Sequence, residues 1–81
     1  MNKTEILKIL NEIFCDVFDD DSIKISESTT AADIENWDSL AQINIIMACQ
    51  SDFGVKFDLN DVLALKSVGS IAELIERKLR L

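Results

Sequence analysis

Residues 37–54 read WDSLAQINIIMACQSDFG, and the spacing of their apolar residues indicates an α-helix from Ser39 to Phe53. Either Asp38 or Ser39 can cap its start, because a short polar side chain there accepts hydrogen bonds from the first free backbone N–H groups. Gly54 can take the left-handed conformation that commonly ends a helix. Pro is absent from the whole chain, which also favours helices.

This helix carries two apolar stripes on nearly opposite faces when it is drawn at 100° per residue. The stripe that we expect to face the core consists of Ile45, Ile46, Cys49 and Phe53. The other stripe, called the apolar strip from here on, consists of Leu40, Ile43 and Met47. A helix at the edge of a small bundle buries only one stripe well. Two interpretations of the apolar strip are therefore open: a loop covers it, or it is exposed and docks a partner.

The flanking sequence predicts three more helices and one long connection. The first helix should span residues 3–18 with Asn2 and Glu5 as a capping box. A short helix should span about residues 59–66, and a last one should begin at a capping box in residues 70–73. The connection, residues 19–38, should be pinned by Ile23, Ile25, Ile34 and Trp37, with one helical turn opening at residues 30–33. We therefore expect an all-α fold in one domain, residues 1–81: a small four-helix bundle of three main helices and one short helix, with a long first loop.

Charge and composition exclude several classes of function. Eight Lys and Arg stand against fifteen Asp and Glu, so the net charge is −7, which argues against nucleic acid or anionic membrane as partners. The chain has no His and two Cys, which excludes a Cys/His zinc site unless a partner completes it, and excludes Ser-His-Asp and Cys-His hydrolases. No apolar run reaches the length of a membrane span, and no signal peptide is visible. We expect a cytoplasmic monomer whose partners have basic or apolar docking surfaces.

The two cysteines are Cys15 and Cys49, on separate predicted helices. An even count fits one disulfide, but free thiols suit a cytosolic chain better. Cys15 lies in the middle of the polar face of the first helix, so we expect an exposed thiol that could cross-link two molecules in air.

Ser39 supports two interpretations. It can be an ordinary helix cap, or its hydroxyl can carry a phosphodiester, because the free N–H groups and dipole at a helix N-terminus tolerate a phosphate. The chain lacks His and has no Lys near Ser39 in the sequence, so it cannot activate this hydroxyl by itself. Any modification must come from another enzyme that brings its own base.

Three motifs in order resemble those of the acyl carrier protein family. They are Trp37-Asp38-Ser39-Leu40, then Asp52-Phe53-Gly54-Val55, then Lys66-Ser67-Val68-Gly69. Asp-Ser-Leu alone is weakly specific. Its position after a long loop, with Phe-Gly-Val fourteen residues beyond the serine and Ser-Val-Gly twenty-eight beyond it, makes the resemblance strong, and the similarity runs from the first helix to Leu79.

The resemblance implies a carrier with no catalytic activity of its own. A phosphopantetheinyl transferase that uses magnesium would transfer 4′-phosphopantetheine from coenzyme A to Ser39, and the terminal thiol of that arm would hold an acyl group as a thioester. The resemblance also implies positions that bind partners or lie near the base of the arm: Asp38, Leu40, Ile43, Met47, Leu65 and Val68. We hypothesise in addition that the loop and the short helix shift to admit an acyl chain.

Two departures from the family pattern concern the choice of partner. The residues after Leu40 include no acid until Asp52, whereas housekeeping fatty-acid carriers place acids there, and Trp37 stands where those carriers have a smaller apolar residue. Both features resemble stand-alone carriers of secondary-metabolite, polyketide or cell-surface pathways. The Gly-Gly typical of peptidyl carriers is missing, which makes an amino-acid carrier less well supported. The rival interpretation is a non-catalytic acidic helical module that binds a partner through the apolar strip.

Overall fold

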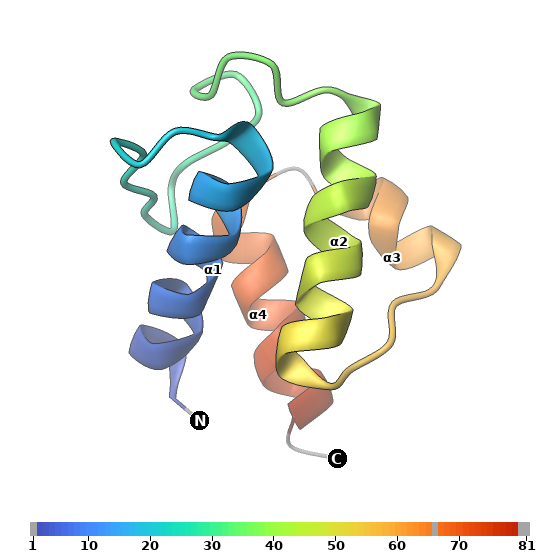
Figure 1. Cartoon of the computed structure of the whole chain (residues 1–81). Helices are drawn as coiled ribbons and strands as arrows, with labels where there is room; N and C mark the ends of the chain where they lie inside the picture. The colour runs from blue at the N-terminus through green and yellow to red at the C-terminus, as the bar shows by residue number, and fades with distance from the viewer. Residues whose placement is uncertain (1, 66, 80–81) are drawn as a thin grey trace.

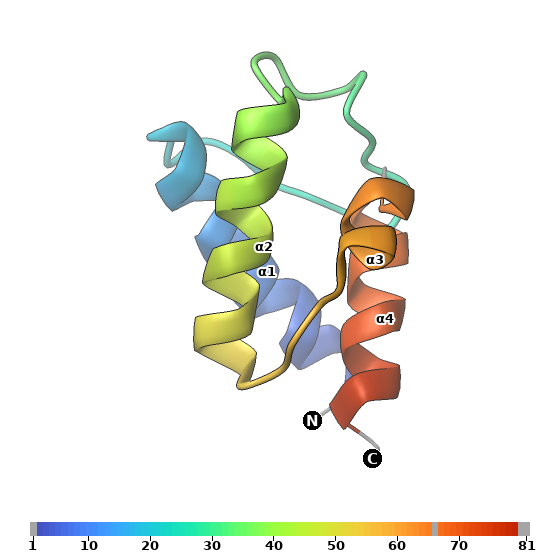
Figure 2. The ribbon, with the colours of Figure 1, turned by 90° about the vertical axis from the view of Figure 1, so that its right-hand side faces the viewer.

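The computed structural model describes residues 2–65 and 67–79, which form four α-helices (Figure 1). Their bounds are α1 Lys3–Phe18, α2 Ser39–Phe53, α3 Leu59–Ala64 and α4 Val68–Leu79. The expected all-α bundle of three long helices, one short helix and a long first loop is confirmed. In Figure 2, α3 lies in front of the upper end of α4, and α1 lies behind α2.

One hydrophobic core lies between the three long helices. α1 packs against both α2 and α4, and α3 packs against α2. The buried side chains of this core are Ile6, Leu10, Ile13, Phe14, Ile45, Ile46, Cys49, Phe53, Leu65, Val68, Ile71, Ala72 and Ile75. The core stripe of α2 is thus placed as the helical periodicity predicts.

The predicted ends of the first two long helices are formed by the expected residues. Asn2 and Glu5 make the capping box of α1, and the helix ends at Asp19, which has a left-handed backbone with φ 51°. α2 is capped by Asp38 and ends at Gly54, where φ is 68°. A glycine adopts this conformation without the steric cost that a Cβ brings.

The loop of residues 19–38 is held against the helices by both apolar and polar contacts. The predicted anchors Ile23, Ile25, Ile34 and Trp37 all pack against the core. The Asn11 side chain of α1 adds a polar clamp: its Oδ1 accepts from the Ile25 N–H at 2.8 Å, and its Nδ2 donates to the Ile23 carbonyl at 3.2 Å. This long segment therefore needs no regular secondary structure to be ordered.

The prediction that Cys15 is exposed was wrong. The loop folds back across α1, so Cys15 is half-buried and its Sγ lies 3.5 Å from the carbonyl oxygen of Ile23. Helical periodicity alone could not show this, because the covering segment follows the helix rather than belonging to it. Both Cys15 and Cys49 are free thiols.

α4 begins at Val68, so the predicted capping box of residues 70–73, which would place Ser70 before the helix, is wrong. The Ser67 hydroxyl acts there instead, since its Oγ accepts from the Ser70 N–H at 3.2 Å, as the side chain of a helix cap does. The loop adds two bonds: the Val68 N–H donates to the Thr29 carbonyl at 2.8 Å, and the Gly69 N–H donates to the Glu27 carbonyl at 3.0 Å. These carbonyls satisfy N–H groups that an early helix start leaves without helical partners. Residue 69 must be Gly for this approach, since a Cβ there would lie 2.7 Å from the Glu27 oxygen.

Two smaller elements also differ from the prediction. The Thr30 N–H donates to Asp33 Oδ2 at 2.9 Å, and the Asp33 N–H donates to the Thr30 carbonyl at 2.9 Å. These residues form a hydrogen-bonded turn, and the predicted single turn of helix is not formed. α3 ends at Ala64, whereas the predicted end at residue 66 lies outside the described residues.

Candidate functional site

Ser39 is the first residue of α2 and its side chain is exposed. The cap is Asp38, whose Oδ1 accepts from the Ala41 N–H at 2.9 Å. Among the described residues, no group hydrogen-bonds the Ser39 hydroxyl. The interpretation of Ser39 as an ordinary cap therefore fails, because Asp38 does that work and leaves the hydroxyl available to solvent.

The residues just before Ser39 are held in a fixed conformation. Asn36 has a left-handed backbone with φ 71°, which Asn tolerates better than most residues, and its carbonyl accepts from the Asp38 N–H at 2.9 Å. The Trp37 ring meets the Phe14 ring of α1 edge-on, with ring centroids 5.1 Å apart. Its indole N–H donates to Gln42 Oε1 at 2.7 Å. Trp37 thus holds the end of the loop, just before Ser39, against both α1 and α2.

The apolar strip is exposed along α2, starting beside Ser39. Leu40 is 66% exposed, Ile43 49% and Met47 60%. The long loop does not cover the apolar strip, so the interpretation that a loop covers it is wrong, whereas docking of a partner stays a prediction. The opposite stripe is buried in the core, which confirms the assignment of the two faces.

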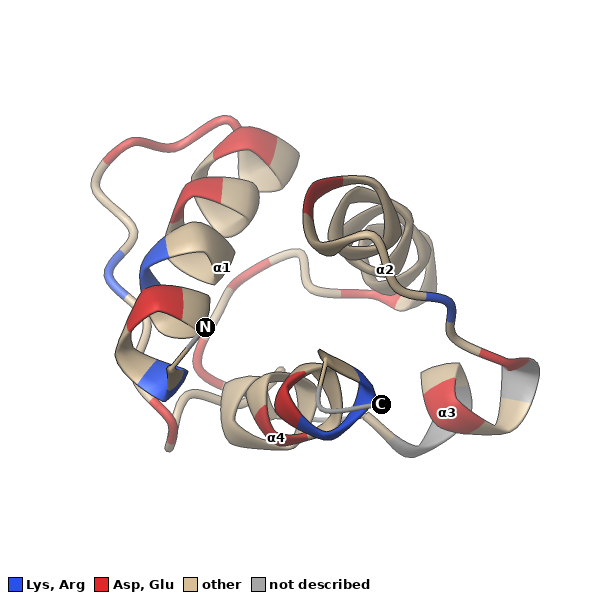
Figure 3. Ribbon diagram, turned by 90° about the horizontal axis from the view of Figure 1, so that it is seen from below, with Lys and Arg blue, Asp and Glu red and all other residues tan. Residues whose placement is uncertain are grey.

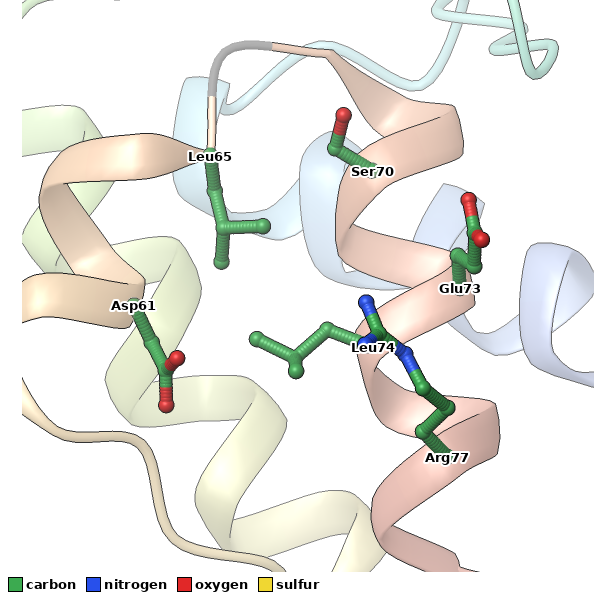
Figure 4. A pocket seen from close by; sticks show the side chains of 6 residues that line it. All are labelled: Asp61, Leu65, Ser70, Glu73, Leu74 and Arg77. Carbon is green, nitrogen blue, oxygen red and sulfur yellow. The ribbon is translucent and has the colours of Figure 1, made fainter.

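The remaining two positions implied near the base of the arm are not on the surface. Val68 is completely buried at the start of α4, so its side chain supports the core and cannot touch a partner in this conformation. Leu65, just after α3, is 7% exposed. It lines a pocket of about 240 Å³ between α3 and α4, shown in Figure 4.

Charge is distributed unevenly around Ser39. Figure 3 shows that the ribbon of α2 is almost free of charge; Asp52 is its only charged residue. The exposed acids Asp33, Glu35 and Asp38 lie instead in the loop before the serine. Within residues 2–65 and 67–79, no group of three or more His, Cys, Asp or Glu side chains is arranged to hold a metal ion.

Three amide side chains make contacts that sequence reasoning missed. Asn11 clamps the loop to α1, Gln42 joins the loop to the end of α3, and Gln50 accepts from the Phe57 N–H at 2.9 Å. Asn11 and Gln50 bond to non-helical backbone, whereas Gln42 bonds to the Trp37 side chain and to carbonyls at the end of α3. In the sequence, such a contact is indicated only by an Asn or Gln between the apolar and polar faces of a helix, and this pattern is weakly specific.

The site fits a covalently attached phosphodiester. The hydroxyl is exposed and not used in the fold, and the first turn of a helix offers free N–H groups and the positive end of its dipole to a phosphate. The chain has no His, and no Lys lies near Ser39 in the sequence, so we expect another enzyme to install such a group.

A comparison with known protein families identifies the family of the chain. Residues 8–75 match the family model described as the phosphopantetheine attachment site. The chain belongs to the acyl carrier protein family. Similar curated proteins are acyl carrier proteins of Thermosynechococcus vestitus, 32% identical over 78 residues, and of Thermotoga maritima, 31% identical over 78 residues. In both cases the match covers 96% of this chain and 96% of the relative.

Solved acyl carrier proteins share the fold. The solution structure of the holo acyl carrier protein from Geobacter metallireducens superposes with a TM-score of 0.85 at 43% identity, covering 93% of this chain and 86% of that one. The crystal structure of the acyl carrier protein from Thermotoga maritima has a TM-score of 0.86 at 18% identity, covering 99% and 93%.

Membership of this family establishes the class of activity. An acyl carrier protein has no catalytic activity, and it works through a covalently attached 4′-phosphopantetheine group. When bound, that group supplies a thiol that forms thioesters with acyl groups. In the part of the chain that the structure describes, no helix is both long enough and apolar enough to cross a bilayer.

Proposed function

We propose that Ser39 is the residue that carries 4′-phosphopantetheine, and that this chain delivers acyl thioesters to partner enzymes in trans. The observation that carries the proposal is the division of roles at the start of α2. Asp38 caps the helix, while Ser39 beside it keeps an exposed hydroxyl that takes no part in the fold. A phosphopantetheinyl transferase can therefore reach the hydroxyl without disturbing the helix.

The apolar strip is the docking surface in this proposal. The strip begins next to Ser39 and continues down one face of α2 through Leu40, Ile43 and Met47. An enzyme that binds the strip therefore has the attached arm at the edge of its binding surface. Asp38 remains exposed and adds one negative charge there. Leu65 can act only through the shape of the pocket that it lines, and Val68 only through the core.

The scarcity of acids on α2 supports partners outside housekeeping fatty-acid synthesis. Acids along this helix would attract basic enzyme surfaces from a distance, and here only Asp52 is present. We place the carrier in the cytoplasm, in a secondary-metabolite, polyketide or cell-surface pathway, as a monomer whose acyl-loading and acyl-using enzymes meet it mainly through apolar contacts.

An interaction module without an arm is the rival candidate; the exposed apolar strip taken alone fits both, and the family match favours the carrier. Intact-mass measurement separates the two. The protein is incubated with coenzyme A, magnesium and a broad-specificity phosphopantetheinyl transferase, and the expected result is a gain of one phosphopantetheine group. Ser39→Ala should abolish the gain. Ser51→Ala, which alters an exposed serine of the same helix, should retain it.

Absence of any mass gain in a protein that circular dichroism shows to be folded would support the interaction module. A gain that survives Ser39→Ala would move the attachment to another residue.

A further inference from the structure

One glutamine side chain connects three separate segments of the chain. Gln42 lies one turn beyond Ser39 on α2. Its Oε1 accepts from the indole N–H of Trp37 in the loop at 2.7 Å. Its Nε2 donates to the carbonyl of Leu65 at 2.8 Å and reaches that of Val62 at 3.4 Å. The oxygen of this amide thus bonds to the loop, and its nitrogen bonds to the end of α3.

The carbonyls that Gln42 contacts belong to the end of α3, where a helix leaves its last carbonyls without helical partners. α3 has six residues, and its C-cap residue Leu65 has an extended backbone with φ −86° and ψ 104°. It therefore lacks the left-handed cap that ends α2 at Gly54. Gln42 supplies from a neighbouring helix the hydrogen bonds that such a cap supplies locally.

The other polar contacts of α3 and its approach are at different places. Gln50 of α2 accepts from the Phe57 N–H, before α3 begins. Lys78 of α4 forms a partly exposed ion pair with Asp61, with Nζ and Oδ2 3.4 Å apart, and a pair of this kind contributes little free energy. Within the described residues, Gln42 therefore makes the side-chain hydrogen bonds that fix the C-terminal end of α3.

The position of that end shapes the pocket between α3 and α4. Figure 4 shows Asp61 and Leu65 on the α3 side facing Leu74 on the α4 side. The complete lining consists of Asp61, Leu65, Ser70, Glu73, Leu74 and Arg77. Because Leu65 is both a wall of the pocket and a hydrogen-bond partner of Gln42, movement of α3 away from α2 would change the pocket.

We infer that Gln42 is a positioning residue that holds the C-terminal end of α3 against α2 and thereby sets the width of the pocket between α3 and α4. Through Trp37, the same side chain links this end of α3 to the loop that precedes Ser39. The inference concerns the unmodified chain, so it goes beyond the proposed role of Ser39 and does not depend on it.

Two substitutions separate the two halves of this link. Gln42→Glu keeps an acceptor for the indole but has no N–H to donate to the carbonyls of α3. Gln42→Met keeps the length of the side chain and removes both hydrogen-bonding ends. Asn44→Asp is the matched control, since it adds the same charge as Gln42→Glu at an exposed position of the same helix. The chain has one Trp and no Tyr, so its fluorescence reports Trp37.

Amide hydrogen exchange of the unmodified protein, followed residue by residue by NMR, tests the inference. In both Gln42 variants, the amides of residues 58–65 should exchange about tenfold faster, as expected when one or two net hydrogen bonds are lost. The amides of α1 should keep their rates, and Asn44→Asp should match the wild type. The emission of Trp37 should shift in Gln42→Met and stay unchanged in Gln42→Glu.

Either of two exchange results would overturn the inference. One is unchanged exchange in residues 58–65 of both Gln42 variants. The other is acceleration of equal size in α1 and α4, which indicates a global loss of stability without a positioning role. If the buried charge of Gln42→Glu prevents folding, Gln42→Met alone decides between these results. An emission shift in Gln42→Glu as large as that in Gln42→Met would contradict the link to Trp37.

Discussion

Truncating the two faces of α2 separately should have very different effects on stability. Phe53 is 8% exposed, and a buried aromatic side chain removes about 200 Å² from water. At about 25 cal/mol per Å², that area corresponds to about 5 kcal/mol; because Ala still buries part of it, Phe53→Ala should cost about 4 kcal/mol, within the usual range for such a change. Met47 is 60% exposed, so Met47→Ala should cost less than about 1 kcal/mol, which the higher helix propensity of Ala partly offsets.

Urea denaturation followed by far-ultraviolet circular dichroism measures both effects. For an m-value of about 1–2 kcal/mol per M, Phe53→Ala should lower the midpoint by about 2–4 M, and Met47→Ala should shift it by well under 1 M. A domain of this size has a total stability of about 4–12 kcal/mol, so the first variant can be largely unfolded in water. A larger loss for Met47→Ala than for Phe53→Ala would refute the assignment of the two faces.

Met47→Ala also tests docking, with Asn44→Ala as its control. Met47→Ala should lower kcat/KM of a phosphopantetheinyl transferase that acts on this chain, because it removes part of the exposed strip. Asn44→Ala, an exposed change elsewhere on α2, should leave kcat/KM unchanged. Equal losses for the two variants would show that the strip has no special part in recognition by that enzyme.

Two further predictions concern the core and the loop. Burial raises the pKa of the Cys49 thiol from 9.0 to about 12, so iodoacetamide at pH 8 should modify only Cys15 in the native chain. The protonated Cys49 thiol stabilises the fold fully below pH 9, and this stabilisation should decline as the pH rises toward 12. The urea midpoint of the wild type should therefore fall between pH 8 and pH 10.5 by more than that of Cys49→Ala. Rapid modification of both cysteines would contradict this burial, as would an equal change of the urea midpoint with pH in the wild type and in Cys49→Ala. Gly69→Ala should cost about 1–3 kcal/mol, since its Cβ would press on the Glu27 carbonyl, and a wild-type melting temperature would show that the loop yields.

The long helices and the two faces of α2 were predictable because local rules determine them. Asn2, Asp38 and Gly54 lie at helix ends and act through neighbours only a few residues away. The apolar strip followed from periodicity, whereas the sequence left its exposure open, because only the structure shows that the long loop does not cover it. The place of Ser39 at the start of the helix left two interpretations open, and only the resemblance to acyl carrier proteins implied that it carries the arm.

Most features that sequence reasoning missed depend on contacts between distant segments. The start of α4 uses the carbonyls of Glu27 and Thr29 in addition to the nearby Ser67 hydroxyl. The partial burial of Cys15 requires the returning loop. The role of Gln42 requires both Trp37 and the end of α3 to be in place. The sequence of a single helix does not show which distant segments will contact it.

The bonding between the loop and the start of α4 has a consequence for biosynthesis. The carbonyls of Glu27 and Thr29 find their N–H partners on Gly69 and Val68, which a ribosome adds well after Ser39. A nascent chain that has emerged only through α2 has neither these partners nor the side chains of α4 that complete the core. Domains generally fold as units during synthesis. The serine therefore reaches its native surroundings only after α4 has been translated.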